Sequence, residues 1–225
     1  TLIVTGTRVS DRTVAESQSP IDIITPEALQ ATGTTELATA LARALPSLNF
    51  PRPALTDGTS GIRPAQLRGL SPDQVLVLVN GKRRHTAAQL NVNGSIGRGS
   101  SATDLNAIPI AAIERVEVLR DGASAQYGSD AIAGVVNIVL KGSGKGGSLA
   151  VDLGGYSAGD GSKYQVSGDA GLGFAGGRGS LHVAAQISDQ DETNRAGPYQ
   201  GTNPNGAGTN FPGIGETAFV IGDPQ

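Results

Sequence analysis

The most informative stretch of the sequence is residues 108–141, which read IPIAAIERVEVLRDGASAQYGSDAIAGVVNIVLK. Val116–Leu119 and Val135–Leu140 are rich in branched apolar residues, which favour strands. Ile108–Ile113, interrupted by Pro109, predicts a short helical or turn segment ahead of the first strand. The glycines between the two strands permit positive φ angles or close backbone approach around a further short helix. The stretch therefore predicts two strands separated by a short helix.

A further apolar run lies upstream, at Val75–Val79 (VLVLV), and it ends at Asn80-Gly81. A continuous apolar run of this length indicates a strand that is buried on both faces. Asn-Gly is a strong signal for a tight hairpin turn, because both residues tolerate positive φ.

Helix signals precede this strand. Ile21–Thr25 is expected to be a strand, and Thr25 followed by Pro26 marks a helix start, with Thr as the N-cap and Pro at the first helical position. Thr35–Leu45 carries three leucines at helical spacing, and Pro46 ends the pattern. The chain up to about Lys141 therefore predicts a compact α+β domain.

After Lys141 the pattern changes to strict alternation of apolar and small polar residues. Three segments show it, at Leu149–Leu153, Tyr164–Leu172 and Leu181–Ile187. Each is about as long as a transmembrane β-strand, ~9–11 residues. The alternation alone fits a soluble antiparallel meander equally well. The residues on the opposite faces are small and polar, which is typical of a water-filled barrel interior. Three strands cannot close a barrel, and an open sheet edge is not stable in lipid.

The composition excludes several classes of protein. There is no Cys, which excludes a disulfide scaffold, a Cys-ligated zinc site and a Cys nucleophile. The net charge is −3 and no basic stripe is present, so no nucleic-acid partner is expected. No apolar run reaches the ~18–20 residues of a membrane helix. There is no Met either, so Thr1 is expected to be a processed or trimmed end.

Two short patterns match catalytic motifs. Gly142–Gly147 fits G-x-G-x-x-G, but a dinucleotide site needs a helix directly after it, and a strand is expected here. Gly155–Gly159 fits G-x-S-x-G around Ser157, with His182 downstream, but again a strand is expected to follow. A hinge and a hairpin loop are the favoured interpretations, and a serine hydrolase remains an alternative.

Acidic residues gather near the end of the third alternating segment. Asp189, Asp191 and Glu192 could bind a hard cation such as Ca²⁺ through oxygen ligands. A solvated acidic loop is the favoured interpretation, so no metal site and no cofactor are predicted.

Three stretches together resemble the plug domain of TonB-dependent outer-membrane receptors. They are Leu67–Gly69 with Val75–Arg83, Ile108–Gly122, and Ser124–Ile138. The resemblance covers about residues 1–141. It implies a TonB-box-like segment and linker at residues 1–20, an α+β plug domain at 21–145, and the first antiparallel strands of a transmembrane β-barrel at 146–225. The chain would then be a fragment that holds about three barrel strands.

The resemblance also implies a function. Family members carry out TonB-dependent active transport of a scarce ligand of the siderophore-iron, cobalamin or saccharide class across the bacterial outer membrane. The expected partners are TonB, a small-molecule or metal-chelate ligand and outer-membrane lipid. The N-terminal segment would be periplasmic and the loops extracellular, and no catalytic residue is expected. The alternative is a soluble plug-like binding or signalling module.

The resemblance places the TonB contact at the start of the chain. TonB would pair with an extended, β-branched segment, which here is Thr1, Leu2, Ile3, Val4 and Thr5. The alternative is an ordinary first strand packed on the plug.

The ligand is expected at two polar loops, Asn49–Arg63 and Arg83–Ser101. Residues 51–98 hold seven Lys or Arg against two acids, which hints at an anionic ligand. The alternative is that these arginines meet carboxylates on a barrel wall. The candidate ligand residues are Arg52, Arg63, Arg83, Arg84, His85, Gln89, Asn91, Asn93 and Arg98. Arg68, Glu117 and Arg120, beside the strand cores, are expected to pair with one another or with a barrel wall.

Overall fold

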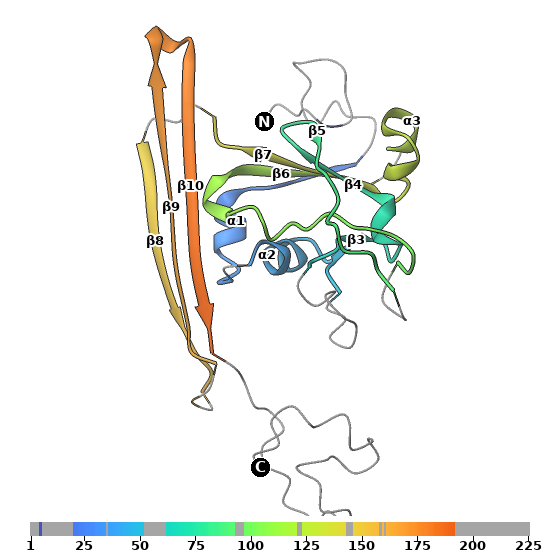
Figure 1. The fold of residues 1–225 in the computed structure, drawn as a ribbon, viewed down its shortest axis with the longest axis horizontal. Helices are drawn as coiled ribbons and strands as arrows, with labels where there is room; N and C mark the ends of the chain where they lie inside the picture. The colour runs from blue at the N-terminus through green and yellow to red at the C-terminus, as the bar shows by residue number, and fades with distance from the viewer. Residues whose placement is uncertain are drawn as a thin grey trace, which may run out of the picture. The chain divides into compact units, whose positions relative to one another are not determined.

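The computed structural model describes residues 5, 20–34, 36–51, 62–92, 97–120, 123–142, 146–157, 159 and 161–191. These residues form a five-stranded sheet with short helices, a two-stranded sheet and a three-stranded sheet, as Figure 1 shows. The α+β domain predicted before Lys141 and the run of antiparallel strands predicted after it are both confirmed. The three described strands of the second part do not form a closed barrel.

The five-stranded sheet has the order β1-β6-β7-β4-β5. The strands are β1 (Ile21–Ile24), β4 (Val75–Val79), β5 (Lys82–Arg83), β6 (Ile113–Leu119) and β7 (Gly134–Leu140). β4 pairs in parallel with β7, and the other neighbours are antiparallel. The VLVLV run is buried over its first four residues, as its composition predicts.

The turn between β4 and β5 is the one that Asn80-Gly81 predicts. Both residues have positive φ, 50° for Asn80 and 76° for Gly81, and Val79 pairs with Lys82 across the turn. A two-residue loop with this geometry matches the twist of the flanking strands. The Asn80 side chain also accepts a hydrogen bond from the Leu140 N–H, which ties the turn to the end of β7.

Short helices and a second small sheet complete the domain. The α-helices are α1 (Pro26–Gln30), α2 (Leu37–Ala44) and α3 (Ser124–Tyr127), and the small sheet pairs β2 (Leu48–Asn49) with β3 (Gln66–Leu67). The 3-10 turns are η3 (Pro72–Gln74), η4 (Ile110–Ala112) and η5 (Ser129–Ala131). Thr25 caps α1 as predicted, since its hydroxyl accepts a hydrogen bond from the Ala28 N–H.

The five-stranded sheet has two unlike faces. On the helix face, Val116, Val118, Val136 and Ile138 belong to one buried cluster with residues of α1 and α2, including Leu29, Leu37 and Leu41. On the second face, Leu76, Leu78, Leu119 and Val135 form a smaller buried cluster. Figure 1 shows α1 and α2 together on one side of the sheet. Because side chains alternate along a strand, Glu117 and Asn137 share the second face.

The three-stranded sheet consists of β8 (Gly146–Gly154), β9 (Lys163–Phe174) and β10 (Gly179–Gln190), with the 3-10 turn η6 (Ala175–Gly177) between the last two. Its large apolar side chains are exposed, whereas Gln165 and Ser167 of β9 are buried. The exposed ones are Leu149, Val151, Leu153, Tyr164, Val166, Leu172, Phe174, Leu181, Val183 and Ile187. This exposure is the reverse of the arrangement that a water-soluble sheet adopts.

The chain divides into two compact units, one of residues 1–152 with 165–188 and one of residues 153–164 with 189–225. Neither boundary coincides with position 145, so the division into three domains stays a prediction. No helix in the described part of the chain is both long and apolar enough to cross a membrane.

Candidate functional site

A chain of polar contacts crosses the second face of the five-stranded sheet; we refer to it as the anchor network. Thr5 Oγ1 donates a hydrogen bond to Glu117 Oε2 at 2.6 Å and accepts one from Asn137 Nδ2 at 2.9 Å. Asn137 Oδ1 accepts from the Gly81 N–H at 3.0 Å. Glu117 Oε1 accepts from Arg115 Nε at 2.9 Å. The network joins the N-terminal segment to β6, to β7 and to the β4–β5 turn.

The three central members of this network are removed from water. Thr5, Glu117 and Asn137 are each 0% exposed. A buried carboxylate is tolerated only when it is paired and hydrogen-bonded, and Glu117 has both an ion pair with Arg115 and the hydroxyl of Thr5. Thr5 is therefore fixed in the interior of the domain. Thr1, Leu2, Ile3 and Val4, the other predicted TonB contacts, lie outside the described residues.

Arg68, Glu117 and Arg120 were expected to pair with one another or with a barrel wall, and the structure contradicts the first of these alternatives. Glu117 pairs with Arg115 instead. Arg120 makes an ion pair with Asp22 across the β1–β6 edge, Nε to Oδ2 at 2.7 Å. Arg68 donates to the carbonyl of Ala133 at 3.1 Å. Each therefore has a partner within the domain, which for Glu117 lies on the same strand, β6.

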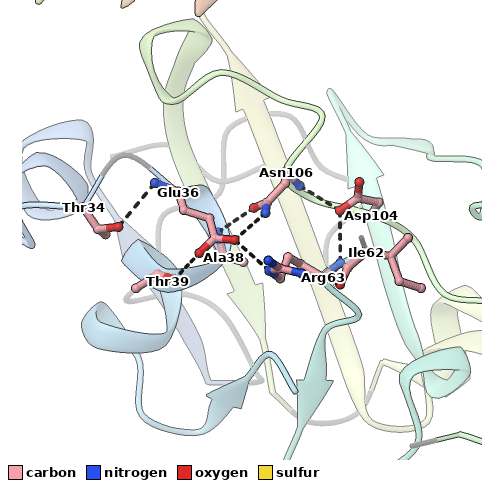
Figure 2. A network of polar contacts seen from close by, with 8 residues as sticks. All are labelled: Thr34, Glu36, Ala38, Thr39, Ile62, Arg63, Asp104 and Asn106. Carbon is pink, nitrogen blue, oxygen red and sulfur yellow. Dashed lines mark hydrogen bonds and ion pairs between the residues drawn. The ribbon is translucent and has the colours of Figure 1, made fainter. Parts of the chain in front are cut away.

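A second network, shown in Figure 2, lies at the start of α2; we refer to it as the loop-base network. Glu36 Oε1 accepts from Arg63 Nε and from Asn106 Nδ2, both at 2.7 Å, and Glu36 Oε2 accepts from Thr39 Oγ1 at 2.6 Å. Asp104 Oδ1 accepts from the backbone N–H groups of Arg63 and Asn106 at 3.2 and 3.1 Å. Asn106 Oδ1 accepts from the first turn of α2 at Ala38.

The loop-base network holds the C-terminal end of the first predicted ligand loop beside the segment that follows the second loop. Arg63 closes the first loop, and Asp104 and Asn106 follow the second loop within a few residues. Pro64 and Asp104 form an antiparallel bridge, and a second bridge joins Leu90 to Ser101. The C-terminal ends of the two loops therefore meet at a common base that the side chain of Glu36 organises.

Two of the predicted ligand arginines, Arg63 and Arg83, make ion pairs within the protein. Arg63 pairs with Glu36, and its side chain is 16% exposed. Arg83 pairs with Asp130 and donates to the Tyr127 carbonyl at 2.7 Å. Arg63 contacts Glu36 at the start of α2, which packs in the cluster on the helix face, whereas Arg83 of β5 contacts α3 and η5, which pack against the cluster on the second face. The structure therefore does not bring these two arginines into one site.

The remaining predicted ligand residues differ in exposure. His85 and Arg98 are exposed, Arg84 and Gln89 are half-buried, and Asn91 is buried at 2%. The Asn91 backbone bonds across the second loop, with its N–H to the Ser100 carbonyl and its carbonyl to the Gly99 N–H. Arg52 and Asn93 lie outside the described residues. His85 and Arg98 are thus the described candidates best placed to meet a ligand.

Sequence reasoning missed the residues that organise both networks. Glu36, Asp104 and Asn106 are not among the predicted site residues, and the sequence predicts Asn137 only as part of a strand. One signal was available for Asn137, because an amide inside the apolar run Gly134–Leu140 needs a buried partner.

The catalytic patterns lack the structure that their chemistry needs. Gly146 and Gly147 begin β8, so a strand rather than a helix follows the G-x-G-x-x-G pattern. The residues after Gly159 lead into β9, so Ser157 does not stand on a strand–turn–helix elbow. Among the residues that the structure describes, no group of three or more His, Asp or Glu is placed to hold a metal ion.

Comparison with known proteins assigns the family. The family model described as TonB-dependent Receptor Plug Domain matches residues 13–135, which is more than half of the chain. The chain therefore belongs to the TonB-dependent receptor plug domain family, as the sequence resemblance indicated.

Curated relatives are receptors and transporters. The chain is 34% identical over 121 residues to the probable TonB-dependent siderophore receptor PirA of Acinetobacter baumannii, which covers 54% of this chain and 16% of the relative. It is 32% identical over 141 residues to the vitamin B12 transporter BtuB of Vibrio cholerae, covering 63% and 20%. The chain thus spans no more than about a fifth of the length of these relatives.

Solved structures agree on the fold. The crystal structure of the siderophore receptor PirA from Acinetobacter baumannii matches with a TM-score of 0.60 at 26% identity, covering 78% of this chain and 25% of that one.

Proposed function

We propose that the natural protein is a TonB-dependent transporter that carries a scarce ligand across the bacterial outer membrane, with an iron–siderophore complex as the first ligand class to test. Cobalamin and saccharides are the other classes. The names of two relatives suggest the first two classes, since one is a siderophore receptor and the other a vitamin B12 transporter.

The observation that carries the proposal is the exposure pattern of β8–β10. In a chain of the plug family, a sheet with outward Leu149, Leu172 and Ile187 and with buried Gln165 and Ser167 matches a lipid-facing wall over a polar interior. A soluble binding or signalling module would leave these apolar side chains in water, which is unfavourable by about 25 cal/mol per Å². Outer-membrane lipid is therefore a proposed partner.

The proposed mechanism forms no covalent bond and needs no cofactor. A ligand binds at the two loops above the loop-base network, where Arg98 and His85 offer exposed polar groups. TonB adds as a strand to the periplasmic segment Thr1–Thr5 and pulls on it. The domain then rearranges and the ligand passes. Passage of the ligand therefore depends on a directional force on this segment and not on a chemical step.

The test uses the natural gene product in its own host under iron limitation. We expect it in the outer-membrane fraction, and we expect a strain without the gene to lose uptake of one labelled ferric siderophore. Deletion of Thr1–Thr5 should abolish this uptake while leaving the protein in the membrane. A product found only in the soluble fraction would refute transport and favour the binding module.

A further inference from the structure

We propose that Glu117 and Asn137 are positioning residues for the TonB-contacting segment, and that they hold it through the hydroxyl of Thr5 until it is released. This inference rests on the proposed function, because it describes how the segment that TonB would contact is held. It also goes beyond that function, because it assigns the anchor to two named residues of the central strands.

The hydrogen bonds of the anchor network are complementary in direction. The Gly81 N–H donates to Asn137, the Asn137 amide donates to Thr5, and the Thr5 hydroxyl donates to Glu117. The hydroxyl both donates and accepts, which is the full use of a Thr side chain. A Val of the same shape could do neither, so the arrangement specifies a hydroxyl at position 5.

The anchor is attached to the middle of the sheet. β6 and β7 are interior strands, and Glu117 and Asn137 are register partners there. Thr5 is 112 and 132 residues away from them in the chain, so the contact is a tertiary one that the fold must assemble. Because Thr5 directly follows Val4, a pull on the first four residues reaches this contact before any strand of the sheet.

Release of the anchor has a cooperative character. When Thr5 leaves, Asn137 Nδ2 loses its acceptor in a region where both residues are fully buried. Unsatisfied buried groups are strongly unfavourable, so intermediate positions of Thr5 are poorly populated. The segment is therefore either held or free.

Asn137 also connects the anchor to the β4–β5 turn. The same amide accepts from Gly81, and the chain after β5 continues into the second predicted ligand loop. A displacement of this turn would reorient the amide that holds Thr5. The two hydrogen bonds of the Asn137 side chain thus link the start of the second predicted ligand loop to the N-terminal segment.

The experiment places a spin label at Ile3→Cys in the full natural protein and measures the ratio of mobile to immobile label, with neither TonB nor ligand present. Thr5→Val removes both hydrogen bonds and should raise this ratio about tenfold or more. Thr5→Ser keeps the hydroxyl and should leave the ratio within about twofold of the parent. Thr5 lies outside every strand, so both variants are expected to fold.

Two results would overturn the anchor. One is a label in Thr5→Val as immobile as in the parent, and the other is equal release in Thr5→Ser and Thr5→Val. Uptake assays test the proposed function separately. If the protein fails to transport but the label behaves as expected, the transport proposal is refuted and the anchor proposal stands.

Discussion

Glu117 and Asn137 face each other across β6 and β7, and both hydrogen-bond the same hydroxyl, that of Thr5. Both are fully buried, Glu117 between two valines of β6 and Asn137 in the otherwise apolar β7. Buried polar residues are stabilised by their hydrogen-bond partners, so removing a partner should lower the stability of the folded protein.

Arg115→Met should destabilise the protein strongly, because it removes a cation that pairs with the buried Glu117 carboxylate. Breaking a buried ion pair from one side costs about 3–5 kcal/mol, and the midpoint of thermal or urea unfolding of the natural chain measures it. Glu114 is the matched control, since it pairs with the same arginine but is 52% exposed. Glu114→Ala should cost less than about 1 kcal/mol. Equal effects would show that burial of Glu117 is irrelevant.

Asn137→Leu removes the amide that joins Thr5 to Gly81 and should destabilise the folded state by about 1–3 kcal/mol, since the buried Thr5 hydroxyl loses a donor and the Gly81 N–H loses its acceptor. In a double-mutant cycle with Thr5→Val, the two changes should be non-additive because they remove the same hydrogen bond. Additive unfolding free energies would mean that the two side chains do not interact.

Glu36→Ala should loosen both predicted ligand loops, because Arg63 and Asn106 lose their shared acceptor. We expect faster cleavage of the chain by a protease in residues 52–61 and a loss of about 1–3 kcal/mol in stability. Glu27→Ala is the control, since Glu27 is an acid in the first turn of the neighbouring helix α1 and takes no part in this network. Its effect should stay below about 1 kcal/mol. Unchanged cleavage in Glu36→Ala would contradict the role of the network.

Gly134→Ala should be far more damaging than Gly81→Ala. Gly134 has φ 148°, and an added Cβ would collide with the Leu119 carbonyl and the Leu67 side chain. Gly81 has φ 76° with open space around it, so only the backbone strain of about 1–2 kcal/mol applies there. The steric term at Gly134 adds about 1–3 kcal/mol. Comparing the two unfolding midpoints checks the difference, and equal midpoints would contradict it.

Arg98→Glu tests the ligand hypothesis. Arg98 is an exposed cation in the second predicted ligand loop. If the ligand is anionic, reversing this charge should weaken its binding about tenfold or more, as measured by isothermal titration with a ferric siderophore. Arg43→Glu, at the end of α2, should leave the affinity unchanged. A neutral ligand such as a saccharide would be indifferent to both changes.

Local signals were sufficient for the elements of this fold and insufficient for its polar contacts. The VLVLV run, the Asn80-Gly81 turn and the Thr25 cap depend on neighbours in the chain, and each was predicted. Arg63 and Arg83 were predicted as ligand residues because no acid close to them in the sequence pairs with them. Their partners, Glu36 and Asp130, lie 27 and 47 residues away. A charge that is paired by the fold looks unpaired in the sequence.

The same limit applies to Thr5, whose partners are more than a hundred residues distant. Composition could place it in an extended N-terminal segment, but only the parallel pairing of β4 with β7 and the antiparallel pairing of β6 with β7 bring Gly81, Asn137 and Glu117 to one face. In β8–β10, by contrast, alternation predicted that the apolar side chains share one face of each strand, but the structure was needed to show that this face is exposed.

The edges of the two larger sheets differ in a way that affects handling of the protein. One edge of the five-stranded sheet is β5, which is only two residues long and presents Lys82 and Arg83, both exposed. A short, charged edge discourages the addition of a foreign strand. The outer strands of the other sheet, β8 and β10, run for 9 and 12 residues beside exposed leucines and valines. Aggregation in water should therefore begin at β8 or β10, and detergent should suppress it.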